Sequence, residues 1–443
     1  MAAVRSLNRL EIVGETRHYA LNAWAQLVPE WLKEQVTAAW LVRYGKRFSD
    51  YQQPKGKSER QEVAESIGKD GLALLPAIYQ TSAPASLRSE PAVEVLRQVW
   101  VQHVYQEDGK RTWRPIKDCP PSSVMIASPD DLDSRYSEKR NQSWRGYKVH
   151  LTETCDDETP HVITQVETTT ATDQEVTVVA SIHQALDQRE LLPEVHLLDG
   201  AYTSGEKRVR SQRDYQSDLI GPMRQDQSWQ AHDEQSDEIS PFHMDWDQER
   251  VICPMGQPSR YWKPAKGPRG KATIQVIFAQ KTCLACAGRS RCTRSQTGPR
   301  ELTWHPKEQH QALQAARERQ QSQDFKQRDK RRAGIEGTMS QAAFSLGMRR
   351  TRYRGLPKTH FHHIATAIAI NLQRLVDWIW ETPRSKTRLS HFARLEGGTG
   401  FANNISIRVK TGHSDFMRPL QKGVLAPAVP EAFPCRGHSV QTA

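Results

Sequence analysis

Four cysteines in the second half of the chain have the spacing of a metal site. Cys253 lies in "VICPMG", and Cys283, Cys286 and Cys292 lie in "CLACAGRSRC". Four thiolates suit tetrahedral zinc, and a C-x2-C turn brings two sulfurs onto one ion. We therefore expect a closed Zn²⁺ site with a structural role. Four reduced cysteines without a metal remain the alternative, because Cys253 is remote and the C-x5-C interval is longer than usual.

Two carboxylates predict a second kind of metal site. Asp199 ends the apolar run "EVHLL" and is followed at once by small residues. Open α/β sheets carry functional groups outside the carboxyl ends of their strands, although such an aspartate is often only a turn former. Glu336 lies in the basic helical stretch "KRRAGIEGTMSQ", where a solvated glutamate is the ordinary interpretation. Together the two carboxylates predict a Mg²⁺ site, because hard cations take carboxylate oxygens.

Basic residues follow in the segments 326–332 and 348–358, "KQRDKRR" and "MRRTRYRGLPK". Helical arginines near a metal suit a phosphate backbone, and an interleaved tyrosine can pack against a sugar or base. A solvated basic face is the alternative, but the net charge of +11 favours a polyanionic partner. The predicted DNA-binding residues are Arg349, Arg350, Arg352, Tyr353, Arg354 and Lys358.

Two further motifs are weaker candidates. His360, His362 and His363 in "THFHH" begin an amphipathic helix and have no partner motif that would complete a ligand set. The stretch "TSGEK" lacks the glycines that a phosphate-binding loop requires. We assign no site to either motif.

The elements that must position these residues follow from their periodicity. Residues 1–106 repeat apolar residues at helical spacing. Residues 146–155 and 161–171 alternate as strands joined by a hairpin loop. A helix starting near Thr172, the strand that ends at Asp199, a short basic helix and the strand "SDLIGP" come next. This order predicts an α/β fold.

The remaining segments differ in character. Residues 223–303 contain short strands and the cysteines, residues 306–381 are helical again, and the Gly- and Pro-rich end predicts disorder. We expect a helical insertion at 1–135, the first part of a core at 136–222, a four-cysteine insertion at 223–303, the helical end of the core at 304–395 and a disordered tail at 396–443.

The composition bears on the cellular compartment. The N-terminus has no apolar core of signal-peptide length, and no stretch approaches the roughly 20 apolar residues of a membrane span. Seven cysteines among 443 residues do not suggest a disulfide scaffold. We expect a cytoplasmic protein.

Several separated motifs resemble one family when they are taken in order. "WRGYKVHLTETCDD", "LLDGAYTS", the four cysteines, "RRAGIEGTMSQ" and "RYRGLPKTHFHHIATAIAINLQRL" resemble bacterial insertion-sequence transposases of the DDE type. More narrowly, they are similar to the subgroup with a cysteine-containing insertion before the last catalytic residue. The resemblance runs from about residue 4 to 395.

The resemblance implies a fold and an activity. Members of this family have a ribonuclease-H-like mixed sheet with flanking helices and hold two Mg²⁺ on an Asp-Asp-Glu triad. They cleave and join DNA strands, so the implied partner is double-stranded DNA, at transposon ends and target, bound by a homodimer. Asp199 corresponds to the middle aspartate, Glu336 to the glutamate and Arg332 to the arginine of the Tyr-x2-Arg-x3-Glu signature.

This sequence departs from the family pattern at three points. "DGAY" stands where the family has Asp-Ala-Gly-Tyr, and Asp329 stands at the signature tyrosine. The first aspartate of the triad normally precedes the segment that matches "AAVRSLNRLEIVGET", so we expect an N-terminally truncated transposase without the first core strand. The acidic run Asp130, Asp131 and Asp133 lies in a polar linker and is not expected to replace that aspartate.

The expected function is therefore that of a Mg²⁺-dependent DNA transposase whose catalytic site is incomplete. A non-catalytic DNA-binding remnant that competes or pairs with full-length transposase is the alternative from another class. A plain metal-dependent nuclease explains less, because it leaves the order of the motifs without a reason.

Overall fold

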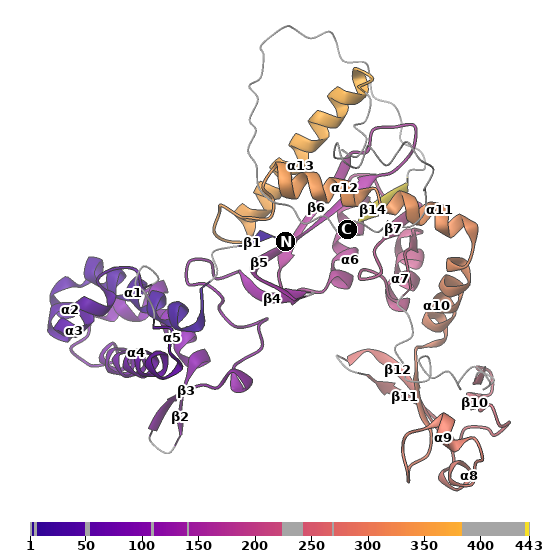
Figure 1. The fold of residues 1–443 in the computed structure, drawn as a ribbon, viewed down its shortest axis with the longest axis horizontal. Helices are drawn as coiled ribbons and strands as arrows, with labels where there is room; N and C mark the ends of the chain where they lie inside the picture. Colours follow the sequence, from indigo (N-terminus) through magenta and orange to yellow (C-terminus); the bar gives the residue numbers. More distant parts are fainter. Residues whose placement is uncertain are drawn as a thin grey trace, which may run out of the picture.

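The computed structural model describes residues 2–3, 7–48, 54–107, 110–139, 141–223, 242–267, 270–382 and 439–442. Figure 1 shows a helical unit, a central sheet with helices on it and a small β-rich unit, which is inserted in the chain between strands and helices of the central part. None of the described helices is long and apolar enough to cross a membrane.

The helical unit has its own apolar core. Helix α1 begins with a capping box, in which Asn8 and Glu11 each accept a hydrogen bond from the other's backbone N–H. Its buried residues pack against α5, and Trp24 and Val13 are fully enclosed. A hairpin that the periodicity did not predict follows α5. The elements are α1 (Arg9–Leu27), α2 (Pro29–Gln35), α3 (Ala38–Tyr44), α4 (Lys57–Ala77), η2 (Ala85–Ser89), α5 (Pro91–His103), β2 (Val104–Glu107), β3 (Lys110–Trp113) and η3 (Ile116–Asp118).

The central sheet combines antiparallel and parallel pairs. Its order across the sheet is β6–β5–β14–β7–β8, where the first two pairs are antiparallel and the last two are parallel. The two remaining strands pair with β5 nearer its start. The strands are β1 (Ala2–Ala3), β4 (Arg135–Lys139), β5 (Gln142–Thr154), β6 (Ile163–Thr170), β7 (Val195–Leu198), β8 (Asp218–Ile220) and β14 (Ser439–Thr442).

Helices cover both faces of this sheet (Figure 1). On one face, Val149 and Leu151 of β5 pack against Ile335 of α12 and Ile370 of α13. On the other face, Leu198 of β7 packs against Val179 of α6. The helices are α6 (Glu175–Asp187), α7 (Gly205–Tyr215), α10 (Lys307–Gln320), α11 (Gln323–Arg332), α12 (Ile335–Ser340), the π-helix η7 (Gln341–Ser345) and α13 (Leu356–Ile379).

The β-rich unit lies between β8 and α10 in the chain. Val251, Val276 and Phe278 form its core, with Cys253 and Cys283 packed against them. The elements are β9 (His243–Asp245), β10 (Arg250–Ile252), β11 (Tyr261–Lys266), β12 (Ala272–Ile277), α8 (Gln280–Leu284), α9 (Arg289–Cys292) and β13 (Glu301–Trp304).

The mixed α/β architecture and the order of elements from β5 to β8 confirm what the periodicity predicts. Besides the β2–β3 hairpin, two segments differ from the prediction. The helical prediction for 306–381 is interrupted over 346–355, because Gly347 and Gly355 have φ of +70° and +88°, which a helix does not accommodate. Ser439–Thr442, within the predicted disordered tail, instead form β14. The rest of that tail, and residues 383–395, lie outside the described residues.

Candidate active site

Asp199 follows a buried strand and is itself exposed. His196, Leu197 and Leu198 of β7 are buried, and Asp199 is the next residue. Leu197 packs against Phe325 of α11, so the residue two places later falls on the same face of the sheet. The carboxylate therefore lies at the carboxyl end of β7 on the face that α11–α13 cover.

The turn after Asp199 explains the departure from the family's Asp-Ala-Gly-Tyr. A Cβ at Gly200 would lie 2.7 Å from the carbonyl oxygen of Pro222, so only glycine fits at this position. Tyr202 is buried, its backbone N–H donates to the Asp199 carbonyl (2.9 Å), and its hydroxyl lies 2.7 Å from Nδ1 of His150. Burial raises the pKa of Tyr202 and lowers the pKa of His150 to about 3. Both side chains stay neutral and fix the turn that presents Asp199.

Glu336 is held at the surface by its neighbours in α12. Ile335 and Thr338 are buried, whereas Glu336 and Gly337 are exposed. Within the described part of the chain, neither Glu336 nor Asp199 forms a side-chain hydrogen bond or an ion pair. Two carboxylates without such partners thus lie on the side of the sheet that α11–α13 cover, one directly after β7 and one in α12.

A buried network beneath α12 was missed by the sequence analysis. Glu153 of β5 is 1% exposed and accepts hydrogen bonds from the Thr338 hydroxyl (2.7 Å) and from Nη1 of Arg374 (2.8 Å). Arg374 also donates to the His161 carbonyl (2.7 Å) and to Thr338. This network ties α12 and α13 to the sheet two residues from Glu336. The signal was available, since a charged residue stands within the buried run "HLTETC".

Arg332 does not reach either carboxylate of the predicted site. Its Nε donates to Oδ1 of Asp329 at 2.6 Å, within α11. The aspartate that replaces the signature tyrosine therefore pairs with the signature arginine. This pairing compensates the negative charge that the substitution introduces.

The acidic run in the linker has structural partners. Asp130 accepts from the Tyr19 hydroxyl (2.6 Å) and pairs with Arg354 (2.9 Å). Asp131 accepts from the Tyr147 hydroxyl, and Asp133 accepts from the backbone N–H of Leu356 at the start of α13. These carboxylates join the helical unit, the sheet and α13.

Cys253, Cys283 and Cys286 lie close enough to Cys292 to act on its thiol electrostatically. Burial raises the pKa of Cys292, and the thiols of Cys283, Cys286 and Cys253 raise it further, against the opposing effect of Arg300. Tight turns start at Cys253 and Cys283, where Gly256 N–H donates to the Cys253 carbonyl (2.8 Å) and Cys286 N–H to the Cys283 carbonyl (3.4 Å). Among the described residues, however, no group of three or more His, Cys, Asp or Glu side chains is placed to hold a metal ion.

The predicted DNA-binding residues are exposed, in and just beyond the loop before α13. Within the described chain, Arg354 has an ion pair, whereas Arg350, Arg352 and Lys358 have none. In α11, by contrast, Arg328, Arg331 and Arg332 pair with Asp324, Asp157 and Asp329. The loop therefore presents more uncompensated positive charge than the helix.

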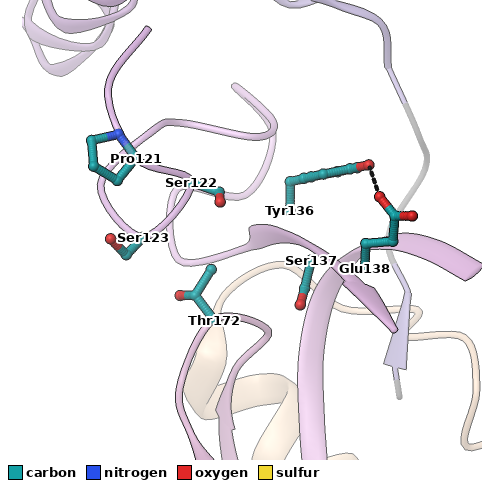
Figure 2. A pocket seen from close by; sticks show the side chains of 7 residues that line it. All are labelled: Pro121, Ser122, Ser123, Tyr136, Ser137, Glu138 and Thr172. Carbon is teal, nitrogen blue, oxygen red and sulfur yellow. Dashed lines mark hydrogen bonds between the residues drawn. The ribbon is translucent and has the colours of Figure 1, made fainter. Parts of the chain in front are cut away.

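The histidines at the start of α13 and a surface hollow beside β4 contain none of the predicted site residues. His360 and His363 lie 3.1 and 2.8 Å from the Thr168 hydroxyl, so they are bound to the sheet. An open hollow of about 400 Å³ lies beside β4 (Figure 2), where Tyr136 donates to Glu138 at 3.5 Å. It is lined by Pro121, Ser122, Ser123, Tyr136, Ser137, Glu138 and Thr172.

The chain thus combines a mixed sheet, exposed carboxylates at Asp199 and Glu336, and an exposed basic loop before α13. Residues 252–376 match the family model of the transposase DDE domain, so this part of the chain is similar to that domain. The match includes Glu336, Arg332 and the four cysteines but not Asp199. No curated protein and no solved structure matches the chain.

Proposed function

We propose that this chain is a DDE transposase in which the central sheet is a ribonuclease-H-like core and Asp199 and Glu336 are metal ligands. The observation that carries the proposal is that both carboxylates are exposed, lack ionic partners within the described chain and lie on the same face of the sheet. A β7 strand end and a helix packed on the sheet position them. The transposase DDE domain match independently supports the family.

The donor set fits Mg²⁺ better than a softer metal. Carboxylate oxygens are the ligands that Mg²⁺ takes, and solvent access at both residues leaves room for bound water. Bound Mg²⁺ would supply charge stabilisation for the attacking and leaving oxygens of a DNA strand. The chain's own contribution is to hold the ligands: Tyr202 fixes the turn at Asp199, and Glu153 with Arg374 fixes the helix at Glu336.

The residues of the strand between β5 and β7 decide whether the proposed metal site has its third carboxylate. In the family fold, the first aspartate of the triad lies on the central strand, and here β14 holds that position with the sequence Ser-Val-Gln-Thr. Residue 441 pairs with Glu153 and Leu197, so its position belongs to the face of Asp199. With glutamine there, the proposed site has two of three carboxylates, and we propose that this chain binds DNA without cleaving it.

A non-catalytic DNA-binding remnant is the second candidate function. Glutamine rather than aspartate at position 441 favours it. The uncompensated charge of Arg350, Arg352 and Lys358 supports DNA contact by the loop before α13. A chain that binds DNA without cutting would compete with an active transposase for the same ends.

We further propose that Cys253, Cys283, Cys286 and Cys292 hold a structural Zn²⁺. Four cysteine side chains are a chemically suitable donor set, and three of them lie within electrostatic reach of the fourth, Cys292. A metal bound to two turns from separate parts of the sequence would fasten the β-rich unit, whose apolar core is small.

A homodimer is proposed on the outer face of α13. The exposed apolar residues there repeat every three and four residues, which is the period of a coiled-coil seam. The positions beside that seam carry no Lys, Arg, Asp or Glu, so two copies would meet without like-charge repulsion. The seam residues are Phe361, Ala365, Ile368, Leu372, Leu375 and Ile379.

Nicking of supercoiled plasmid tests the catalytic proposal. We expect the unaltered chain to bind plasmid without cutting it, and Gln441→Asp to gain Mg²⁺-dependent nicking that a second change, Glu336→Ala, removes. Thr442→Asp is the matched control, because position 442 belongs to the opposite face of the sheet. Cutting by the unaltered chain that survives Asp199→Ala would place the chemistry elsewhere, and a Gln441→Asp variant that binds but never cuts would overturn the assignment of that position.

A further inference from the structure

The position between β5 and β7 is filled by two pieces of chain from distant parts of the sequence. Ala2 of β1 pairs with Tyr147, and Thr442 of β14 pairs with Thr152. Tyr147 and Thr152 each pair with β6 on their other side, so β1 and β14 share one edge of β5. Both run antiparallel to β5. They therefore lie in one line, as two fragments of a single strand position.

The two fragments leave the middle of this position unpaired. Among the described residues, Lys148–Leu151 of β5 have no partner strand on the edge that β1 and β14 occupy. Three residues of this stretch are buried: Val149, His150 and Leu151, at 6%, 2% and 0% exposure. Buried backbone groups need hydrogen-bond partners, so a strand that spans the whole position has more to gain than β14 has.

We propose that this position is a strand-acceptor site, and that β14 is an exchangeable occupant which a continuous strand leading into Ala2 displaces. The register of β1 fixes how such a strand would lie. Each residue before Ala2 moves one place along β5 from Tyr147 towards Thr154. The sixth residue before Ala2 lies opposite Glu153, where β14 places residue 441, so the two strands exclude one another.

The surroundings define the chemistry of the displacing strand. Val149 and Leu151 pack into the apolar cluster beneath α12 and α13, and His150 and Thr152 are buried towards the other face. A strand covered on both faces is typically a near-continuous run of apolar or β-branched residues. The fitting occupant is thus an extended, uncharged segment, with a polar or acidic residue tolerated opposite Glu153, close to the exposed Asp199.

Exchange would also change the candidate metal site. If the proposed function holds, the occupant decides which residue lies beside Leu197 on the face of Asp199. With β14 in place that residue is Gln441, and with a longer strand it is the sixth residue before Ala2. The C-terminal strand would then act as a self-inhibitory occupant. This consequence rests on the proposed function, whereas strand exchange itself does not.

Hydrogen exchange on an N-terminally extended chain tests the proposal. Six added residues of alternating Val and Thr before Met1 reach the register of Thr154. We expect amides of residues 439–442 to lose protection while those of Val195–Leu198 keep theirs. The matched control is a six-residue Gly-Ser extension interrupted by proline, which cannot pair and should leave β14 protected.

Deletion of residues 439–443 provides the second measurement. We expect the deletion to lower the urea midpoint of the unextended chain and to leave that of the Val-Thr-extended chain unchanged. Continued protection of residues 439–442 in the extended chain, or an equal loss of stability in both backgrounds, overturns strand exchange. Neither readout involves DNA or a metal, so failure here is distinguishable from failure of the proposed function.

Discussion

Replacing Arg374 should destabilise the fold strongly, because its partner is buried. Glu153 is 1% exposed and Arg374 is 20% exposed, and Oε2 of Glu153 lies 2.8 Å from Nη1 of Arg374. Arg374→Met removes the cation and leaves a carboxylate in the core, which typically costs about 3–5 kcal/mol. Glu153→Gln leaves an arginine that can turn towards solvent, so we expect a smaller loss of roughly 1–2 kcal/mol.

The double variant Glu153→Gln/Arg374→Met contains no buried charge and should be less destabilised than the sum of the single variants. We expect a coupling energy of roughly 2–3 kcal/mol from urea unfolding of all four proteins. Arg331→Met is the matched control: Arg331 pairs with Asp157 at 2.5 Å, but both side chains are exposed, so the cost should stay below about 1 kcal/mol. Additive single losses, or a loss on Arg374→Met no larger than in the control, would refute the assigned role of the network.

Three further predictions address other parts of the molecule. Elemental analysis should find one Zn²⁺ per chain, lost in Cys283→Ser/Cys286→Ser together with stability of the β-rich unit, and an unchanged metal content would exclude the four-cysteine site. The logarithm of the DNA association constant should fall linearly with the logarithm of the salt concentration, with a slope of roughly −0.9 per phosphate contacted. Replacing the loop cations together by alanine should make this slope less steep; they are Arg349, Arg350, Arg352 and Lys358. An unaltered slope would mean that these side chains are ordinary solvated surface residues. Acidification from pH 7.5 to 5.5 should destabilise the fold, because burial lowers the pKa of several histidines that take up protons on unfolding below about pH 6.5. The pKa is lowered to about 3 in His103, His150 and His363 and to about 4 in His183. Below pH 6.5 each of these histidines lowers the free energy of unfolding by about 1.4 kcal/mol per pH unit. A urea midpoint that does not fall over this range would contradict the burial of these histidines in the neutral form.

The sequence is informative where periodicity and burial coincide. The alternation in 146–155 and 161–171 and the apolar run before Asp199 predict β5, β6 and β7, because each of these strands has at least one face in the core. The small residues after Asp199 suggest a tight turn, and Gly200 is indeed enclosed by Pro222. Local pattern is sufficient for such elements.

The local sequence pattern does not predict elements whose structure depends on contacts with distant segments of the chain. Nothing in "SVQT" predicts a central strand; β14 is a strand because β5 and β7 supply partners from far along the chain. The network of Glu153, Thr338 and Arg374 joins residues separated by 185 and 221 positions. The resemblance to the family signature implies a catalytic role for Arg332, whereas in the structure Arg332 pairs with Asp329. That role stays a prediction, as do the Zn²⁺ and Mg²⁺ sites.

The central claim is that Asp199, Glu336 and the strand position of residue 441 surround one metal site. A Mn²⁺ titration followed by EPR of the free ion measures it directly. The account predicts weak binding by the unaltered chain, further weakened by Asp199→Ala or Glu336→Ala, and strengthened roughly tenfold by Gln441→Asp through a third carboxylate. Thr442→Asp should leave the affinity as it is. Indistinguishable Mn²⁺ affinities for the unaltered chain, Asp199→Ala, Glu336→Ala and Gln441→Asp would contradict the account.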